Sequence, residues 1–315
     1  MLSLRRSATL LLLGLGLSAP GTAAADPKLV VEKEKLRAAL ECPQPVEPGA
    51  GRPILLVHGT ATNPEENWGW NYWKILPERG YTTCAVRLPR RSMPDIQRQA
   101  QYVVFAIRKL AKRSGRKVDV IGHSQGTLQP RWAIKWWERT RRKVNDYISL
   151  AGPHHGTAAA DFACAPGFCA PSVWQMRQGS KFTAALNRGD ETPGKAAFTS
   201  IYSQVDELVQ PHSTAALEGA SNVLVQEICP ARPVPHIGPL WDAVVFALVI
   251  DALEHRGPAL PGRLPATICA ETYTPGLTLI DIPPDALDYS VAAWQDLSER
   301  WPATEEPKLA RYARR

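Results

Sequence analysis

The sequence predicts an α/β fold in which a mostly parallel central sheet is flanked by helices, and three observations support this prediction. Strand and helix patterns alternate along the 315 residues without an internal repeat, an order that is typical of parallel sheets. The strand candidates are short, continuous apolar runs between turn residues, as expected for strands that are buried on both faces. A composition of 44% hydrophobic and 21% charged residues indicates a globular core and disfavours disorder, collagen-like structure and coiled coils.

Six segments have the strand pattern. They are residues 54–57, 81–86, 118–121, 146–150, 197–203 and 222–226. Residues 95–112 carry apolar side chains at helical spacing, and Pro94 and Asp95 mark the start of this crossover helix. Residues 240–253 predict a second, largely apolar helix. Residues 152–194 are rich in Gly, Pro, Ala and Cys, which predicts a small cap or lid over the carboxyl edge of the sheet.

The N-terminus has the pattern of a secretory signal peptide, which we expect to span residues 1–25. Arg5 and Arg6 supply a positive region, residues 10–17 are apolar, and three alanines at 23–25 suit a signal peptidase. The adjacent arginines leave general secretion and twin-arginine export both open. We therefore expect a secreted protein with one domain, residues 26–315. No later stretch approaches the length of a membrane-spanning helix, so no transmembrane segment is expected.

The cysteines and the charge distribution indicate the compartment and the class of partner. All six cysteines lie in the expected mature part: Cys42, Cys84, Cys164, Cys169, Cys229 and Cys269. An even number in an exported protein predicts three disulfides, although the sequence alone does not choose their pairing. The formal net charge of +7 is spread along the chain except for a basic run at 139–143, which argues against a nucleic-acid partner.

The candidate nucleophile is Ser124, in the sequence Gly-His-Ser-Gln-Gly at residues 122–126. This G-x-S-x-G motif directly follows the third predicted strand and precedes a helical run, the context that a nucleophile elbow requires. Gly122 and Gly126 leave room for the strand and helix to approach, so that the serine hydroxyl is held at the edge of the sheet.

A serine nucleophile needs a base and an orienting carboxylate, and in this strand-turn-helix context they follow it in the order acid, then histidine. Asp206 lies just after a predicted strand and is the candidate acid, with Glu207 and Asp190 as alternatives. His236 lies in a loop before the apolar helix and is the candidate base. His212 follows Asp206 too closely to come from a separate loop, and His255 ends a helical stretch.

Acyl transfer also needs donors for the developing oxyanion. The backbone N–H of Gln125, next to the nucleophile, is one candidate. Thr60 follows the first predicted strand and can offer its N–H and its hydroxyl. Ordinary turn chemistry at the end of a strand is the alternative reading of Thr60.

Together these segments resemble the α/β-hydrolase lipases of the Candida antarctica lipase B type. The likeness is carried by Gly59-Thr60 with Asn67-Trp68, residues 76–84, Ser124-Gln125-Gly126, residues 170–175, residues 202–206 with 209–211, and residues 306–314. It covers nearly all of the expected mature chain. The resemblance implies an α/β-hydrolase fold, the same triad of Ser124, Asp206 and His236, and an oxyanion hole of Thr60 and Gln125. It also implies the disulfides Cys42–Cys84 and Cys229–Cys269.

The chain departs from that family at several positions. His123 stands where the family has a tryptophan that lines the alcohol pocket, and Cys164 with Cys169 is an extra pair, which we predict closes a small loop in the cap. The family's last disulfide has no cysteines here. By the resemblance, His123, Trp174, Leu287 and Val291 are candidates for the substrate pocket, with plain core packing as the alternative for the helix that contains the last two.

These observations predict a secreted serine ester hydrolase, a triacylglycerol lipase or a carboxylesterase, that forms an acyl-enzyme. A polyester depolymerase, an acyltransferase and a non-catalytic binding protein on a hydrolase scaffold are the alternatives. We expect no cofactor and no metal, since His154 and His155 lack further ligands at metal-binding spacing. The expected partner is an ester or lipid substrate, including one at a lipid–water interface, and the expected state is a monomer.

Overall fold

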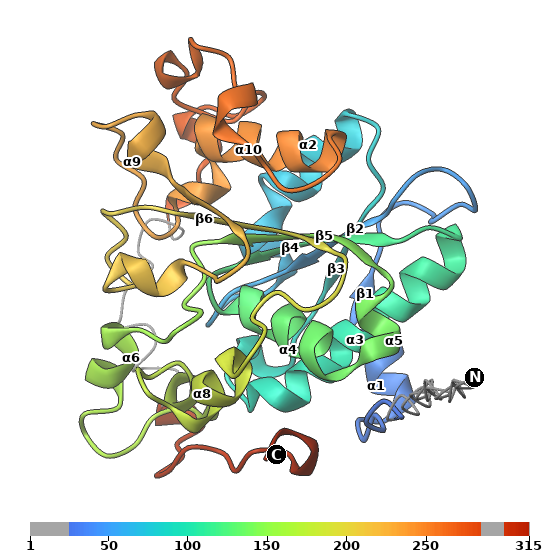
Figure 1. Ribbon diagram of the computed structural model, residues 1–315, viewed down its shortest axis with the longest axis vertical. Coiled ribbons are helices and arrows are strands. Elements are labelled where there is room, and N and C mark those ends of the chain that lie inside the picture. Colours follow the sequence, from blue (N-terminus) through green and yellow to red (C-terminus); the bar gives the residue numbers. More distant parts are fainter. Residues whose placement is uncertain (1–24, 285–298, 315) are drawn as a thin grey trace, which may run out of the picture.

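A seven-stranded sheet forms the centre of the protein in the computed structural model, which describes residues 25–284 and 299–314 (Figure 1). The strand order is β1-β3-β2-β4-β5-β6-β7. The strands are β1 (Leu40–Glu41), β2 (Ile54–Val57), β3 (Thr83–Val86), β4 (Val118–His123), β5 (Val144–Leu150), β6 (Ala197–Tyr202) and β7 (Ser221–Leu224). β1 pairs with β3 in antiparallel fashion, and all other pairs are parallel. The predicted fold class is thereby confirmed.

The six predicted strands correspond to β2 through β7, with small differences at their ends. β2 has the predicted bounds, and β3 begins two residues later than predicted. β7 ends two residues earlier than predicted, because helix α9 (Val225–Ile228) begins there. The sequence does not predict β1, because its two partly exposed residues carry no recognisable pattern. β4 continues past residue 121 to His123, so the sheet leads directly into Ser124.

The continuous apolar strands are explained by helices on both faces of the sheet. In β2, Leu55 and Val57 pack with the residues of α3 (Ile96–Ser114) and α4 (Leu128–Trp136). Ile54 and Leu56 pack instead with α2 (Tyr72–Glu78) and α10 (Ala243–Glu254). Figure 1 shows these two pairs of helices on opposite sides of the strands. Because neighbouring residues of a strand point to opposite faces, a strand covered on both sides needs apolar residues at every position.

The two predicted helices begin at aspartates. The Asp95 side chain accepts a hydrogen bond from the N–H of Gln97 at the start of α3, and Gly115, with φ of 68°, ends that helix in the left-handed region. The Asp242 side chain accepts from the N–H of Val245 and starts α10 there. This helix begins at Ala243, three residues later than predicted, because Leu240 ends a separate 3-10 turn, Gly238–Leu240.

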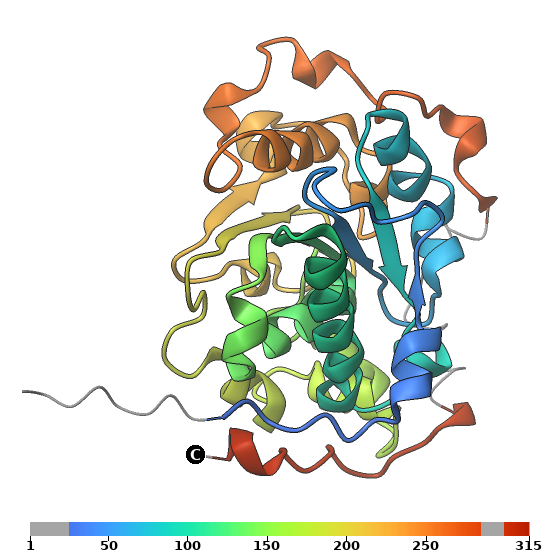
Figure 2. The same cartoon turned by 90° about the vertical axis from the view of Figure 1, so that its right-hand side faces the viewer.

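The remaining helices are short. They are α1 (Lys33–Ala38), α5 (Glu138–Arg141), α6 (Ala158–Ala163), α7 (Pro171–Gln175), α8 (Lys181–Asn187) and α9 (Val225–Ile228). Helices α6, α7 and α8 lie within the segment expected to form a cap, whose role as a lid stays a prediction. In both views the C-terminal segment, drawn in dark red, runs along the side of the molecule that carries α3 and α8 (Figure 2). There the Glu306 carboxylate accepts hydrogen bonds from the N–H groups of Lys181 and Phe182.

All six cysteines are paired. The disulfides are Cys42–Cys84, Cys164–Cys169 and Cys229–Cys269. This pairing confirms the two bridges implied by the family resemblance and the extra bridge expected in the 152–194 segment. Residues 1–24 of the expected signal peptide lie outside the described residues. Within the part of the chain that the structure describes, no helix combines the length and apolarity that crossing a membrane requires.

Candidate active site

Ser124 occupies a sharp turn between β4 and α4, at the carboxyl end of a central strand. Its φ is 54°, in the left-handed region that a residue with a side chain rarely adopts. Residues Ser124–Thr127 form a 3-10 turn before α4 begins at Leu128. Such backbone strain is characteristic of nucleophile elbows, where the turn presents the hydroxyl beyond the end of the strand.

The two glycines of the motif are required by close backbone approach. A Cβ atom at Gly126 would lie 2.2 Å from the carbonyl oxygen of Val57 and 2.5 Å from that of His58, both at the end of β2. A Cβ at Gly122 would lie 2.4 Å from the carbonyl oxygen of Gly126. The obstructing atoms belong to the backbone, so they cannot move aside as a flexible side chain would. The glycines therefore let the elbow pack directly against β2.

Gly126→Ala is accordingly expected to lower the free energy of unfolding by about 3 kcal/mol or more, because β2 and the elbow must separate. Chemical denaturation would measure the change. Gly262→Ala is the matched control: a Cβ at Gly262 meets nothing within 4 Å, and its effect should stay within about 0.5 kcal/mol. Equal stability of the Gly126 variant and the wild type would contradict this account of the motif.

Three side chains from three separate loops meet at this elbow. Nε2 of His236 lies 2.8 Å from Oγ of Ser124, and Nδ1 of His236 lies 2.9 Å from Oδ2 and 3.0 Å from Oδ1 of Asp206. All three side chains are buried. The N–H groups of Leu208 and Val209 donate to Oδ1 of Asp206 at 2.8 Å each, which fixes the carboxylate facing the imidazole. This chain of hydrogen bonds, from Ser124 to His236 to Asp206, permits a proton to pass from the serine hydroxyl to the histidine.

The charges of Asp206 and His236 stabilise one another. Burial raises the pKa of Asp206, but the attraction of His236 and the hydrogen bonds that the carboxylate accepts outweigh it, and the pKa lies below its ordinary value. Burial lowers the pKa of His236, but the charge and hydrogen bond of Asp206 outweigh it, and the pKa lies above its ordinary value. The pair therefore favours an aspartate beside an imidazolium, the state that follows proton transfer from serine.

The alternative acids and bases lie elsewhere. The Glu207 carboxylate accepts a hydrogen bond from the backbone N–H of His236 at 2.9 Å, and its charge contributes to raising the pKa of His236. Asp190 is exposed and accepts from the N–H of Thr192. The His212 ring stacks on Tyr202, and His255 lies beside Asp251 on α10. Among the described residues, neither His212 nor His255 hydrogen bonds Ser124, and Asp206 is the carboxylate that faces Nδ1 of His236. The geometry therefore favours Asp206 and His236.

The candidate oxyanion residues lie together where β2 meets the elbow. The hydroxyl of Thr60 donates to Oε1 of Gln125 at 2.7 Å, and both residues have no exposed surface. Nε2 of Gln125 donates in turn to the carbonyl oxygen of Ser92 at 2.8 Å. The structure thus brings together the two residues that sequence motifs placed in this role, and it adds Ser92, which no local sequence signal distinguishes.

His123 connects two of the loops around the site. Its Nε2 lies 3.1 Å from the carbonyl oxygen of His236, and its Nδ1 lies 3.2 Å from Oδ1 of Asn67, which also accepts from the Gly59 N–H. Burial lowers the pKa of His123 to about 3, so its ring is neutral. The ring has no exposed surface, and its role in lining a substrate pocket stays a prediction.

The other candidates for the substrate pocket are Trp174, Leu287 and Val291. Trp174 is partly buried, and its indole N–H donates to the carbonyl oxygen of Ala303 at 2.9 Å. The guanidinium of Arg177 lies over its ring at 4.9 Å. Leu287 and Val291 lie outside the described residues, so the pocket expected there stays a prediction.

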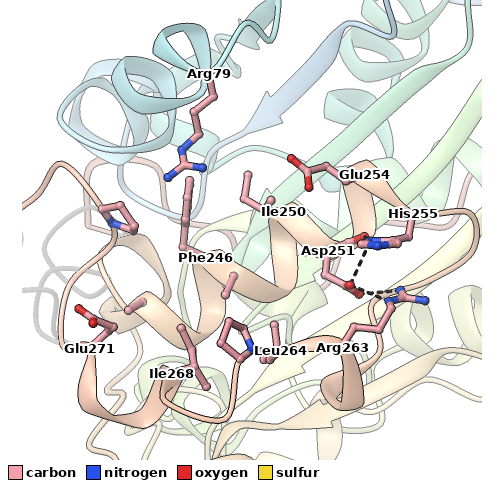
Figure 3. Close-up of a pocket in the computed structure, with 14 residues that line it drawn as sticks. Arg79, Phe246, Ile250, Asp251, Glu254, His255, Arg263, Leu264, Ile268 and Glu271 are labelled. Atoms are coloured by element: carbon pink, nitrogen blue, oxygen red, sulfur yellow. Dashed lines mark hydrogen bonds and ion pairs between the residues drawn. The ribbon is translucent and has the colours of Figure 1, made fainter.

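A separate pocket of about 330 Å³ lies over α10, and it lacks the chemistry for acyl transfer. Figure 3 shows its apolar floor of Phe246, Ile250, Leu264 and Ile268. At its rim Asp251 pairs with Arg263 and His255, but the pocket lining contains no serine, threonine or cysteine that could act as a nucleophile. Within residues 25–284 and 299–314, no three His, Cys, Asp or Glu side chains are grouped as metal ligands. The site at Ser124 is therefore the candidate for ester chemistry.

Comparison with known proteins adds independent information. The family model for class 2 lipases matches residues 51–230. The chain is 32% identical to lipase B of Pseudozyma antarctica over 237 residues, which cover 73% of this chain and 69% of the relative. It is also similar to the crystal structure of Aspergillus fumigatus lipase B, with a TM-score of 0.83 and 31% identity, covering 92% of this chain and 74% of that one.

Proposed function

Because the chain belongs to the class 2 lipase family and is a carboxylic ester hydrolase, we propose that it is an exported lipase or carboxylesterase whose catalytic residues are Ser124, His236 and Asp206. One observation carries this proposal: the Ser124 hydroxyl, the His236 ring and the Asp206 carboxylate form a continuous chain of hydrogen bonds. The distances are 2.8 Å from Ser124 Oγ to His236 Nε2 and 2.9 Å from His236 Nδ1 to Asp206 Oδ2.

In the proposed reaction, Oγ of Ser124 attacks the ester carbonyl while Nε2 of His236 takes the hydroxyl proton. Asp206 holds the imidazolium that forms. The backbone N–H groups of Thr60 and Gln125 stabilise the oxyanion of the tetrahedral intermediate. His236 then gives its proton to the leaving alcohol, which leaves an acyl-enzyme on Ser124. Water, activated by the same histidine, releases the carboxylic acid and restores the serine.

We propose export because disulfides persist in oxidising compartments, and all six cysteines are paired. Asp26, the residue expected to begin the mature chain, also belongs to the folded domain: its carboxylate lies 2.6 Å from the Arg108 guanidinium. We propose that export removes the segment expected as a signal peptide, residues 1–25, and leaves a single catalytic domain from 26 to 315.

The activity can be tested with the purified mature protein and p-nitrophenyl esters from acetate to stearate, with emulsified triacylglycerol alongside. Ser124→Ala serves as the control for background hydrolysis. Hydrolysis of long-chain esters and of the emulsion would establish a lipase, and hydrolysis of short soluble esters alone would establish a carboxylesterase. Activity that is equal in the wild type and the Ser124 variant would refute the proposal.

A further inference from the structure

The basic run at residues 139–143 lies beside a second basic segment in the folded protein. That segment, residues 109–117, is the end of α3 and the loop after it, and α3 contacts α5 where Nε of Arg108 donates to Oγ1 of Thr140 at 2.8 Å (Figure 1). Neither segment contains an acidic residue. Their basic side chains, all at least partly exposed, are Lys109, Lys112, Arg113, Arg116, Lys117, Arg139, Arg141, Arg142 and Lys143. The fold therefore gathers a positive charge on one surface that neither segment has alone.

This surface continues along the amino edge of the sheet. Lys117 directly precedes β4, Lys143 directly precedes β5, and Lys195 lies two residues before β6. Because these three strands are parallel neighbours, the segments that lead into them meet at one edge. Ser124 follows the opposite, carboxyl end of β4. The six residues of that strand separate the basic edge from the nucleophile by about 20 Å.

A pocket of about 570 Å³ lies at this edge, among the loops that lead into the three strands. Four cations line it: Lys117, Arg141, Arg142 and Lys195. Two carboxylates also line it. Glu138 forms an ion pair with Arg142, and Asp190 accepts a hydrogen bond from a backbone N–H. Within residues 25–284 and 299–314 the other three cations form no ion pair. The pocket therefore has positive charge that a bound anion can neutralise.

Arg141 is held at this pocket by its contact with Gly194. A Cβ atom at Gly194 would lie 2.8 Å from Cδ and 2.9 Å from Cγ of Arg141. Only glycine lets the arginine stem pack so closely on the backbone at 194, and this packing limits the directions that the guanidinium can take. A planar guanidinium matches two oxygens of one sulfate or phosphate group. The pocket thus suits a tetrahedral oxyanion.

The shape of the pocket favours a flexible polyanion. A polysaccharide chain can place one charged group in the pocket while its neighbouring groups contact α3 and α5. A flat bilayer and a stiff nucleic-acid duplex present their charges on an even surface, so they fit a concave site less well. None of the residues that line the pocket is aromatic, whereas single-stranded nucleic acids are bound by stacking on aromatic side chains.

We propose that residues 109–117 and 139–143, together with Lys195, bind an anionic polysaccharide whose charges are sulfate or phosphate groups. The surface holds the exported enzyme on such a polymer, while the site at Ser124 stays open to substrate at the opposite edge of the sheet. The inference goes beyond the proposed function, and the binding is measured without an ester substrate.

The test compares two triple variants that lose the same charge. The pocket variant combines Lys117→Gln, Arg141→Gln and Lys195→Gln. The control variant removes three exposed cations that lie on or next to α2 and α10, and it combines Lys74→Gln, Arg79→Gln and Arg256→Gln. Thermal unfolding establishes that both variants fold. If the pocket variant does not fold, the double variant of Lys117→Gln and Lys195→Gln, both exposed, takes its place.

Binding is measured by fluorescence anisotropy of a labelled heparin oligosaccharide, at an ionic strength of about 0.1 M. The pocket variant should bind about 10²-fold more weakly than the wild type, because each cation beside an anionic surface contributes a factor of about five. The slope of log Kd against log salt concentration should fall by about two to three. The control variant should bind within about threefold of the wild type, since its cations lie more than a Debye length from the pocket.

Equal losses in the two triple variants would show that net charge alone governs binding, and would overturn the inference. Wild-type protein that does not bind heparin would overturn it too, as would tighter binding to a DNA duplex or to vesicles of equimolar phosphatidylcholine and phosphatidylglycerol.

Hydrolysis of a soluble p-nitrophenyl ester provides a second readout. It should be equal in the wild type and the pocket variant and unaffected by heparin, because the nucleophile lies about 20 Å from the basic edge. Inhibition of the wild type by heparin would place the bound polymer at the catalytic site instead and overturn the inference. Heparin binding by a protein that hydrolyses no ester would refute the proposed function alone.

Discussion

Ser124→Ala is expected to lower kcat for ester hydrolysis by about 10⁶-fold, the effect of removing the nucleophile of a serine triad. The remaining rate would come from the oxyanion donors and from substrate binding, which alanine leaves in place. The fold should persist, because the substitution removes one oxygen atom from a buried turn whose shape depends on Gly122 and Gly126. Steady-state kinetics and thermal unfolding measure the two effects.

A matched serine makes this experiment specific. Ser200 in β6 is as buried as Ser124, and its hydroxyl donates to the carbonyl oxygen of Ala215 at 2.7 Å. Ser200→Ala should keep its activity and its labelling by a fluorophosphonate probe, whereas Ser124→Ala should lose both. Continued labelling of the Ser124 variant would place the nucleophile at another residue.

What could be predicted from the sequence depended on how far apart the interacting residues lie along the chain. The elbow was predictable because Gly122, Ser124 and Gly126 act within five residues of one another, and the strand before them has its own pattern. Asp206 and His236 were predictable because parallel strands bring their carboxyl-end loops to one edge of the sheet, in a fixed chain order. The structure places both side chains within hydrogen-bond distance of each other.

The hydrogen bond between Gln125 and Ser92 could not be predicted in this way. Ser92 and Gln125 are separated by 33 residues, and neither side chain has a pattern that indicates its partner. The left-handed conformation of Arg90 and Arg91 is also invisible in the sequence, since arginine has no preference for it. Similarly, β1 exists because Leu40 and Glu41 pair with Val86 and Ala85 of β3, a contact that depends on the tertiary fold.

Asp206→Asn is expected to lower kcat by about 10⁴-fold, although it changes one oxygen for one nitrogen. In the wild type the Asp206 carboxylate accepts the proton on Nδ1 of His236, so that Nε2 can accept the proton of Ser124. An asparagine amide turned toward Nδ1 would favour the opposite tautomer, which presents N–H to the serine and cannot act as a base. Glu207→Gln is the control, because it removes the charge of the neighbouring carboxylate, which accepts a hydrogen bond from the backbone N–H of His236. Its kcat should stay within about tenfold of the wild type.

The pH dependence of kcat/KM tests the electrostatic part of the same prediction. His236 must be neutral to act as a base, and Asp206 raises its pKa above the ordinary value of 6.5. In the wild type kcat/KM should therefore rise with pH and reach its midpoint above that value. Removing the carboxylate charge lowers the pKa of His236, so the midpoint of the weak residual activity in Asp206→Asn should move to lower pH. Burial lowers the pKa of His58 to about 4 and that of His123 to about 3, so these two rings do not titrate above pH 6.5. A midpoint that stays unchanged in Asp206→Asn would show that another group controls the protonation of the base.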